Sequence, residues 1–252
     1  MPNGRNDPSM LAPFAGRLQI GGSAVAYSQH AAKPKPTSKD LLHQQRGRSA
    51  DRSCVRSLGA GTGLTMPSGP GVINESLIAE IAAGVPPPIA TFLLTCQQRV
   101  RGIITQQRCC RTNTVQLVDR LVDGSYDELR EALPGISLVQ VVHVTGPESV
   151  DEAMAAAEHV DAVLLDSGNP SLAIKELGGT GRCHDWSISR KIRKQLDVPI
   201  FLAGGLTPEN ICEAVQAVGP FGLDLCTGVR TNGKLDEQKL RALFSNLETV
   251  MA

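Results

Sequence analysis

The stretch VDAVLLDSGNPSLAIKELGGTGRCHDW, residues 160–186, decides the fold of this chain. It reads as an apolar strand that ends in a carboxylate, then a glycine-rich loop, then Asp185-Trp186 at the start of a helix. Two more glycine-rich strand ends follow, IFLAGGL at 200–206 and GLDLCTGV at 222–229. Three successive strands that finish in polar or glycine-rich loops place a carboxylate and sites for a phosphate-sized anion on one rim. This arrangement indicates chemistry on a small phosphorylated substrate.

Apolar, β-branched segments alternate with helical patterns from about residue 60 onward. The predicted strands lie near 60–65, 88–95, 113–118, 137–144, 161–166, 198–203 and 221–227. The predicted helices span 74–84, 97–108, 125–133, 148–159, 187–196, 208–218 and 236–250. This alternation predicts a parallel sheet with right-handed crossovers, which either closes into a barrel or stays open and doubly wound. The barrel is favoured because polar groups follow three consecutive strands, and barrel phosphate sites commonly follow strands 7 and 8.

The first strand of such a barrel is hard to place. Regular spacing predicts it near 35–40, but the sequence there, KPKPTSKD, has two Pro, three Lys and no apolar residue. Such a segment does not form a buried strand. The apolar candidate upstream is RLQIGGSAVAY at 17–27, and we take 18–20 as the first strand. Residues 28–52 then form an irregular insertion, longer than loops usually run in compact domains. Cys54 is expected on the first helix.

Charge divides the chain into a basic first part and an acidic remainder. Residues 1–60 hold nine Lys and Arg against three Asp. Because the whole chain has 25 basic and 25 acidic residues, the remainder holds 16 basic against 22 acidic ones. We therefore predict a basic, largely irregular leader at 1–58, with a degenerate first strand at 18–27, and a barrel domain at 59–252. The predicted fold class is α/β, a (β/α)8 TIM-type barrel with a degenerate or missing first βα unit.

Composition argues against several classes of function. The leader has few aromatic residues and no nucleic-acid-binding motif, so no nucleic acid partner is expected. No apolar run approaches the ~18–20 residues of a membrane span, and the N-terminus lacks the apolar core of a secretory signal. The seven Cys include no C-x-x-C pair, and adjacent Cys109 and Cys110 suit neither zinc nor an ordinary disulfide. We expect reduced thiols in the cytoplasm, and organelle targeting by the leader stays open.

Four segments carry a resemblance to a known family. In order, they are LLDSG, GGTGRCHDWS, PIFLAGGLTPEN and PFGLDLCTGV. Their order and spacing resemble the phosphoribosylanthranilate isomerase family, the barrel enzymes of tryptophan biosynthesis, over residues 59–247. The resemblance implies an Amadori rearrangement. An acid protonates the ribose ring oxygen and opens the ring, a base removes the C2 proton, and an aminoketose forms. We expect no metal and no organic cofactor, because the sequence has no ligand cluster and no dinucleotide-binding Gly-x-Gly-x-x-Gly fingerprint after a first strand.

The resemblance also implies roles for individual residues. Asp166, in the LLD position, corresponds to the general acid, and a carboxyl at a strand's C-terminal end can be tuned by burial for proton transfer. The residues implied for binding the substrate phosphate are Gly204, Gly205, Thr227 and Gly228. The residues implied for a loop that closes over the substrate and for its anchor are Gly178, Gly179, Gly181 and Asp185. Trp186, the only Trp of the chain, belongs to the same anchor.

The chain departs from the family pattern at three positions. The family's general base is a Cys in a Lys-x-Cys-Gly motif that closes strand 1, and alignment of LQIGG with that motif puts Gly21 in its place. Gly71 stands where the family has an Arg that holds the anthranilate carboxylate. The fourth strand reads VQLVD at 115–119, so the family's His there is replaced. The phosphate half of the site and the acid are kept.

Another residue must then act as the base. His143, near the end of the strand VVHVTG, has an imidazole whose natural pKa suits proton transfer. Cys96 also ends a strand and can reach the barrel mouth. A different phosphosugar as substrate, or a barrel that binds a phosphorylated metabolite without turnover, stay open as alternatives. A further interpretation attributes residues 1–58 to a wrong start or a misjoined exon.

Overall fold

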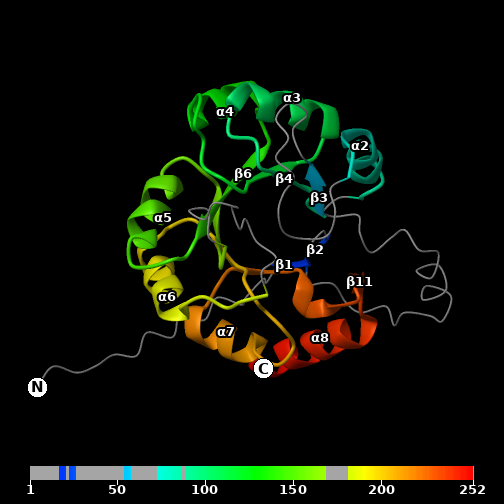
Figure 1. Ribbon diagram of the computed structural model, residues 1–252, viewed down its shortest axis with the longest axis vertical. Coiled ribbons are helices and arrows are strands. Elements are labelled where there is room, and N and C mark those ends of the chain that lie inside the picture. Colours follow the sequence, from blue (N-terminus) through cyan, green and yellow to red (C-terminus); the bar gives the residue numbers. More distant parts are fainter. Residues whose placement is uncertain are drawn as a thin grey trace, which may run out of the picture.

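The structure is a computed structural model, and Figure 1 shows helices α2 to α8 as a ring around a curled sheet. It describes residues 17–20, 23–26, 54–57, 73–86, 89–168 and 181–251. The predicted insertion at 28–52 and the predicted strand at 60–65 lie outside the described residues.

Eight parallel strands form the sheet within the described part of the chain, in the order β1-β9-β8-β7-β6-β5-β4-β3. Their bounds are β1 Arg17–Ile20, β3 Cys54–Ser57, β4 Phe92–Thr95, β5 Thr114–Leu117, β6 Ser137–His143, β7 Ala162–Asp166, β8 Ile200–Leu202 and β9 Gly222–Leu225. A further strand, β2 (Ser23–Ala26), pairs antiparallel with β1. The alternation of parallel strands and helices confirms the predicted α/β class, with helices covering the outside of the sheet as parallel strands require.

The segment before residue 59 contributes to this sheet. β1, the strand expected at 18–20, lies parallel to β9, which is the place that the first strand of a barrel takes beside the last. β3 pairs parallel with β4. The expectation that Cys54 lies on a helix is therefore wrong, because its backbone pairs with Phe92 as the first residue of β3. The division into a leader at 1–58 and a barrel domain at 59–252 stays a prediction.

Seven helices surround the sheet in the described residues. Their bounds are α2 Glu75–Ala83, α3 Val100–Cys110, α4 Tyr126–Ala132, α5 Ser149–Ala157, α6 Trp186–Gln195, α7 Ile211–Val218 and α8 Glu237–Met251. A 3-10 turn, η2 (Thr227–Val229), and a short hairpin of β10 (Arg230–Thr231) and β11 (Lys234–Leu235) precede α8. None of the helices in the described ranges combines the length and apolar character that a membrane crossing requires.

The helix expected at 208–218 starts three residues later than predicted. Thr207 does act as a cap, since its hydroxyl accepts a hydrogen bond from the Glu209 N–H at 3.3 Å. However, it caps a separate turn, in which the Asn210 N–H donates to the Thr207 carbonyl at 3.3 Å. The continuous helix α7 begins only at Ile211. The sequence signal was therefore read correctly as a cap but assigned to the wrong turn.

Two clusters of buried side chains lie on opposite faces of the sheet. One contains helix and strand residues and fills the layer between helices and sheet. The other contains buried residues of the strands and their ends, so it fills the inside of the barrel and is called the lumen cluster here. Its buried members are Phe92, Leu94, Val118, Val139, Val141, Ala162, Leu164, Phe201 and Ala203. Since side chains of a strand alternate between faces, His143 follows Val141 into the lumen and Asp166 follows Leu164.

Three phenylalanines close the lumen below these polar residues. The ring of Phe201 lies edge-to-face against Phe92, with centroids 6.2 Å apart, and against Phe221, at 5.7 Å. Phe92 begins β4 and Phe221 precedes β9, so this phenylalanine floor lies toward the N-terminal ends of the strands. The C-terminal ends are left for polar side chains.

Truncation of the floor should weaken the whole domain. Phe201→Ala removes a ring that is 3% exposed and contacts two others, so we expect the free energy of unfolding to fall by about 3–5 kcal/mol in urea denaturation. Val122→Ala is the matched control, because Val122 is 66% exposed and its loss should change stability by less than about 0.5 kcal/mol. Equal effects of the two substitutions would contradict this account of the core.

Candidate functional site

Asp166 lies at the C-terminal end of β7, inside the barrel. Asp166 is 9% exposed, and its Oδ1 accepts a hydrogen bond from the Ser167 N–H at 2.7 Å. Its own carbonyl accepts from the Val144 N–H at 2.8 Å. The parallel register of β6 and β7 pairs Asp166 with His143. Adjacent parallel strands lie about 4.8 Å apart, so the two residues are neighbours on the lumen face, where the His143 ring reaches toward Val118, the residue after β5.

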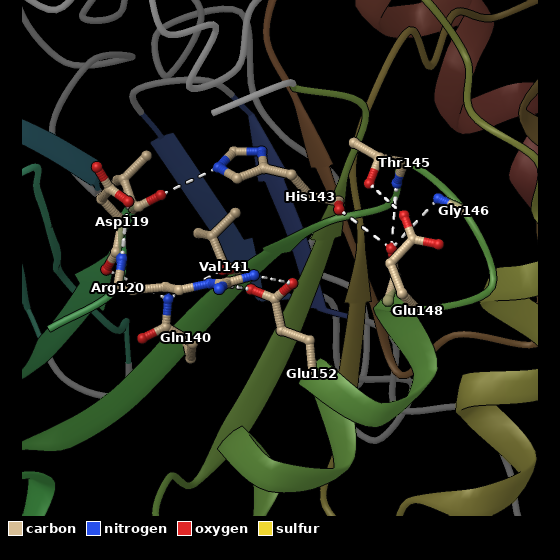
Figure 2. A network of polar contacts seen from close by, with 11 residues as sticks. Asp119, Arg120, Gln140, Val141, His143, Thr145, Gly146, Glu148 and Glu152 are labelled. Carbon is tan, nitrogen blue, oxygen red and sulfur yellow. Dashed lines mark hydrogen bonds and ion pairs between the residues drawn. The ribbon is translucent and has the colours of Figure 1, made fainter. Parts of the chain in front are cut away.

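His143 is held in one tautomer by its surroundings. Its Nε2 lies 3.1 Å from the carbonyl oxygen of Val118. A dashed line from the His143 ring marks this contact in Figure 2. A carbonyl only accepts, so Nε2 carries the hydrogen and Nδ1 keeps a bare lone pair. The residue is 6% exposed, and Nδ1 is buried without a hydrogen-bond partner among the described residues. The described residues therefore leave one acceptor nitrogen of the His143 ring unused.

The backbone of His143 is fixed by the start of α5. The Ser149 hydroxyl donates to the His143 carbonyl at 3.3 Å and accepts from the Thr145 N–H at 3.1 Å (Figure 2). The Thr145 hydroxyl in turn donates to Glu148 at 3.0 Å. Side chain and main chain are thus both held, and such double support is what a catalytic side chain requires for a fixed geometry.

Gly204 connects the carboxylate to the next strand end. Its φ is +85°, and a Cβ there would lie 2.8 Å from the Ser167 hydroxyl and 2.9 Å from the Ser167 nitrogen. Only glycine lets the two backbones approach this closely. The turn after β8 therefore rests directly against the residue that follows Asp166.

Gly205 connects the same turn to the segment before α6. Its φ is +62°, and a Cβ would lie 2.5 Å from the carbonyl carbon of Arg182. The Asn210 amide donates to the Gly205 carbonyl at 2.9 Å, and the Cys183 thiol lies 3.5 Å from the same oxygen. Asn210 also accepts from the Thr207 N–H at 2.8 Å, so it clamps the whole turn.

Gly181 and Gly228 complete the contiguous backbone surface. A Cβ on Gly181 would lie 3.7 Å from the Thr227 hydroxyl, which places the loop end beside the turn after β9. A Cβ on Gly228 would collide with the Leu206 carbonyl. The structure thus brings together five residues that the sequence predicted on one rim beside Asp166: Gly181, Gly204, Gly205, Thr227 and Gly228. Gly178 and Gly179 lie outside the described residues.

Asp185 begins α6 as its N-cap. Its Oδ1 accepts from the Ser187 N–H at 2.8 Å. The hydrogen bonds with Ser187 hold the pKa of this exposed carboxyl below its ordinary value. Trp186 is the first helical residue and packs against the buried cluster between helices and sheet. Both residues therefore anchor the segment that follows the glycine-rich loop.

The other candidate positions lie around the same lumen. Val118, in the strand where the family has His, belongs to the lumen cluster, and Cys96 packs against that cluster. Asp224 lies in β9 between Leu223 and Leu225, which pack on the helix side, so it faces the lumen. Gly21 and Gly71 lie outside the described residues.

Sequence reasoning missed Ser167, Asn210 and His184. The first two support the backbone turns, and they lie within the segments LLDSG and PIFLAGGLTPEN. His184 immediately precedes the capping Asp185, and the carboxylates of Asp166 and Asp185 act on its charge. The histidine in the segment GGTGRCHDWS was the sequence feature that could have identified this position. Within the ranges that the structure covers, no three His, Cys, Asp or Glu residues are grouped to hold a metal ion.

Comparison with known proteins points to one family. Residues 75–246 match the family model of N-(5'phosphoribosyl)anthranilate isomerase. A relative from Methanosarcina mazei, N-(5'-phosphoribosyl)anthranilate isomerase 2, is 37% identical over 172 residues, which cover 67% of this chain and 74% of the relative. The isomerase from Nostoc punctiforme is 35% identical over 198 residues, which cover 77% of this chain and 90% of that protein.

Solved structures share the fold. The phosphoribosyl anthranilate isomerase of Thermotoga maritima superposes with a TM-score of 0.63 at 22% identity, covering 93% of this chain and 99% of that one. Another structure of such an isomerase, in complex with reduced 1-(o-carboxyphenylamino)-1-deoxyribulose 5-phosphate, gives a TM-score of 0.61 at 20% identity over 93% of this chain. At this identity the likeness establishes the barrel fold.

The contact between Gly205 and Arg182 predicts a large effect of a single methyl group. Gly205→Ala should destabilise the protein more than Gly219→Ala, since only the former meets backbone atoms. Gly219 is the matched control because its φ is +64° and a Cβ there would meet nothing within 4 Å. Gly219→Ala should therefore lower the free energy of unfolding by about 1–2 kcal/mol, from the positive φ alone. Both free energies of unfolding can be measured in urea. Equal costs would refute the close approach at Gly205.

Proposed function

The chain belongs to the N-(5'-phosphoribosyl)anthranilate isomerase family, and we propose that the rim around Asp166 carries out that isomerisation in tryptophan biosynthesis. The family model covers residues 75–246, and relatives at 30–37% identity carry the isomerase name. The reaction converts a phosphoribosyl amine into an aminoketose by an Amadori rearrangement. The observation that carries the proposal is the contact of Gly204 with Ser167, which joins the acid and the anion-binding turns in one surface.

Asp166 is proposed as the general acid. Its carboxyl gives a proton to the ribose ring oxygen while the bond from that oxygen to C1 breaks, and the amine nitrogen supplies the electron pair. A ring-opened iminium and a carboxylate result. The enclosed position of Asp166, 9% exposed at the end of β7, supports this role because a proton can pass to the substrate there with little competition from water.

His143 is proposed as the substitute base. Its Nδ1 lone pair takes the C2 proton, and the electrons of that C–H bond form a C1–C2 double bond and neutralise the iminium. The enol that results becomes the ketone product by proton transfer. The site is left with an imidazolium beside a carboxylate, and these are neighbours in the β6–β7 register. One proton transfer between them restores the starting state.

The backbone N–H groups around the two turns are proposed to bind the substrate phosphate. Little side-chain bulk shields the amides of the turns after β8 and β9. Three of the four residues there are glycines, Gly204, Gly205 and Gly228, and the fourth is Thr227 with its hydroxyl. Backbone amides in such glycine turns and at helix starts suit an anion. A small phosphorylated sugar is the partner that this surface fits.

A cytoplasmic location is part of the same proposal. The six cysteines whose side chains the structure describes form no disulfide, and reduced thiols are typical of that compartment.

Replacement of the acid should abolish turnover with little effect on folding. Asp166→Asn keeps the shape but removes the transferable proton, so we expect kcat to fall by about 10²–10⁴-fold. The assay follows the loss of phosphoribosylanthranilate fluorescence. Asp127→Asn on the exposed face of α4 is the control and should leave kcat unchanged. Unchanged turnover in Asp166→Asn would overturn the proposed function.

The role of His143 can be separated from its structural contact. His143→Gln can still donate to the Val118 carbonyl but has no basic nitrogen. We expect kcat to fall about 10²-fold or more in this variant while its melting temperature stays near that of the parent. If the Gln variant turns over normally, His143 only satisfies the carbonyl, and Cys96 becomes the next residue to substitute.

A further inference from the structure

Gln140 is a buried residue on the outer face of β6, behind the lumen that contains His143. Its exposed fraction is 3%. Its neighbours Val139 and Val141 belong to the lumen cluster, so strand alternation turns Gln140 toward the helices. A buried amide needs partners for its two donor hydrogens and its acceptor oxygen. Most of the partners of Gln140 lie around the end of the neighbouring strand β5.

The partners of the Gln140 amide fix its orientation. Its Nε2 donates to the carbonyl oxygens of Leu117 at 3.2 Å, Asp119 at 3.4 Å and Val141 at 2.9 Å. Carbonyl oxygens only accept, so they must face the NH2 group of the amide. The amide oxygen is then left for the Tyr126 hydroxyl, which donates to it at 2.9 Å. Tyr126 of α4 therefore holds the amide with its hydrogens toward the end of β5.

Val118 is the residue between the two β5-end carbonyls that Gln140 binds. Gln140 thus holds the backbone both before and after Val118. The Val118 N–H donates to the Thr95 carbonyl of β4 at 3.0 Å, which holds the same residue from the other side. These bonds together set the direction of the Val118 carbonyl. That carbonyl is the group that lies 3.1 Å from Nε2 of His143.

The segment after β5 has a second tie, which lies at the surface. Arg120 donates to the two carboxylate oxygens of Glu152 of α5, at 2.8 and 2.7 Å (Figure 2). The Arg120 side chain is 69% exposed. Water and salt weaken such an exposed ion pair, so it restrains the backbone little. The buried hydrogen bonds of Gln140 are not weakened in this way.

We propose that Gln140 is a positioning residue for His143, which acts from the outer face of the sheet through the Val118 carbonyl. This inference rests on the proposed function of His143 as the base. A base must present its lone pair to the proton that it removes, and the Val118 carbonyl keeps the ring hydrogen on Nε2. Without the Gln140 amide, the backbone after β5 shifts and this contact loosens. The ring hydrogen can then move to Nδ1, the nitrogen that must stay bare.

The ring of His143 reports this support without any activity. The full-length protein is labelled with ¹⁵N and studied at about pH 8, above the ordinary titration range of imidazole. His143 is assigned by its loss in His143→Gln. In the parent, a single tautomer should give two well-separated ring nitrogen resonances. In Gln140→Met, which keeps the size of the side chain but has no donor, the two resonances should move toward each other as the tautomers exchange.

Gln107→Met is the matched control. Gln107 is also a buried glutamine, and its Nε2 donates to the Thr112 carbonyl at 2.8 Å, but it lies on α3. Both substitutions should lower the melting temperature, since each removes a buried donor from a carbonyl. Only Gln140→Met should alter the His143 resonances. Resonances that stay separated in Gln140→Met, or that converge equally in Gln107→Met, would overturn the proposal.

Activity tests whether Gln140 acts through the base. Gln140→Met should lower kcat about tenfold or more, while KM for phosphoribosylanthranilate changes less than about twofold, because Gln140 faces the helices and not the lumen. Tyr126→Phe, which frees the amide to turn, should lower kcat by a smaller factor. When Gln140→Met is combined with His143→Gln, kcat should fall little further, since the ring that Gln140 positions is already gone. A double variant in which the two losses multiply would refute action through His143.

Failure of this inference differs from failure of the proposed function. A parent protein that does not isomerise phosphoribosylanthranilate would refute the proposed function. The ring resonances of His143 in Gln140→Met would still decide whether Gln140 positions the imidazole.

Discussion

The chemistry of this molecule depends on the parallel register of β6 and β7. That register places His143 opposite Asp166, and strand alternation points both into the lumen at the C-terminal ends. A shift of either strand by one residue would turn its polar side chain toward the helices and bury it among aliphatic groups. The register is fixed by Val139, Val141, Ala162 and Leu164, which must fill the lumen below. The hydrophobic core therefore aligns the proposed acid with the proposed base.

Glycine plays a structural part around this pair. Gly204, Gly205 and Gly228 each lie where a Cβ would meet another backbone. They permit the turns after β8 and β9 and the segment before α6 to touch. Any larger residue at these positions would prevent that contact. The amides that suit an anion and the carboxylate that suits proton transfer thereby become parts of a single surface, although the chain between residues 166 and 228 runs from β7 to η2.

The sequence predicted the barrel class and most element boundaries because hydrophobic periodicity is a local signal. The strand at 137–144 and the helix at 125–133 were found within a residue or two at each end. The start of α7 was misplaced because Thr207 caps a turn before the helix, and a cap has the same local signature in both settings. The contact of Cys183 with the Gly205 carbonyl escaped prediction, since it arises only when the segment before α6 folds back onto the turn after β8. Likewise, the tautomer of His143 depends on the carbonyl of Val118, a contact between strands.

The phenylalanine floor has a consequence for how this protein can change over time. Phe92, Phe201 and Phe221 fill the barrel below Asp166 and His143. They therefore separate the core that stabilises the fold from the C-terminal strand ends, where the ligand is proposed to bind. Mutations beneath the floor can adjust heat tolerance, while mutations in the loops above can shift selectivity, with little interference between them. Stability and selectivity can thus change independently within one domain.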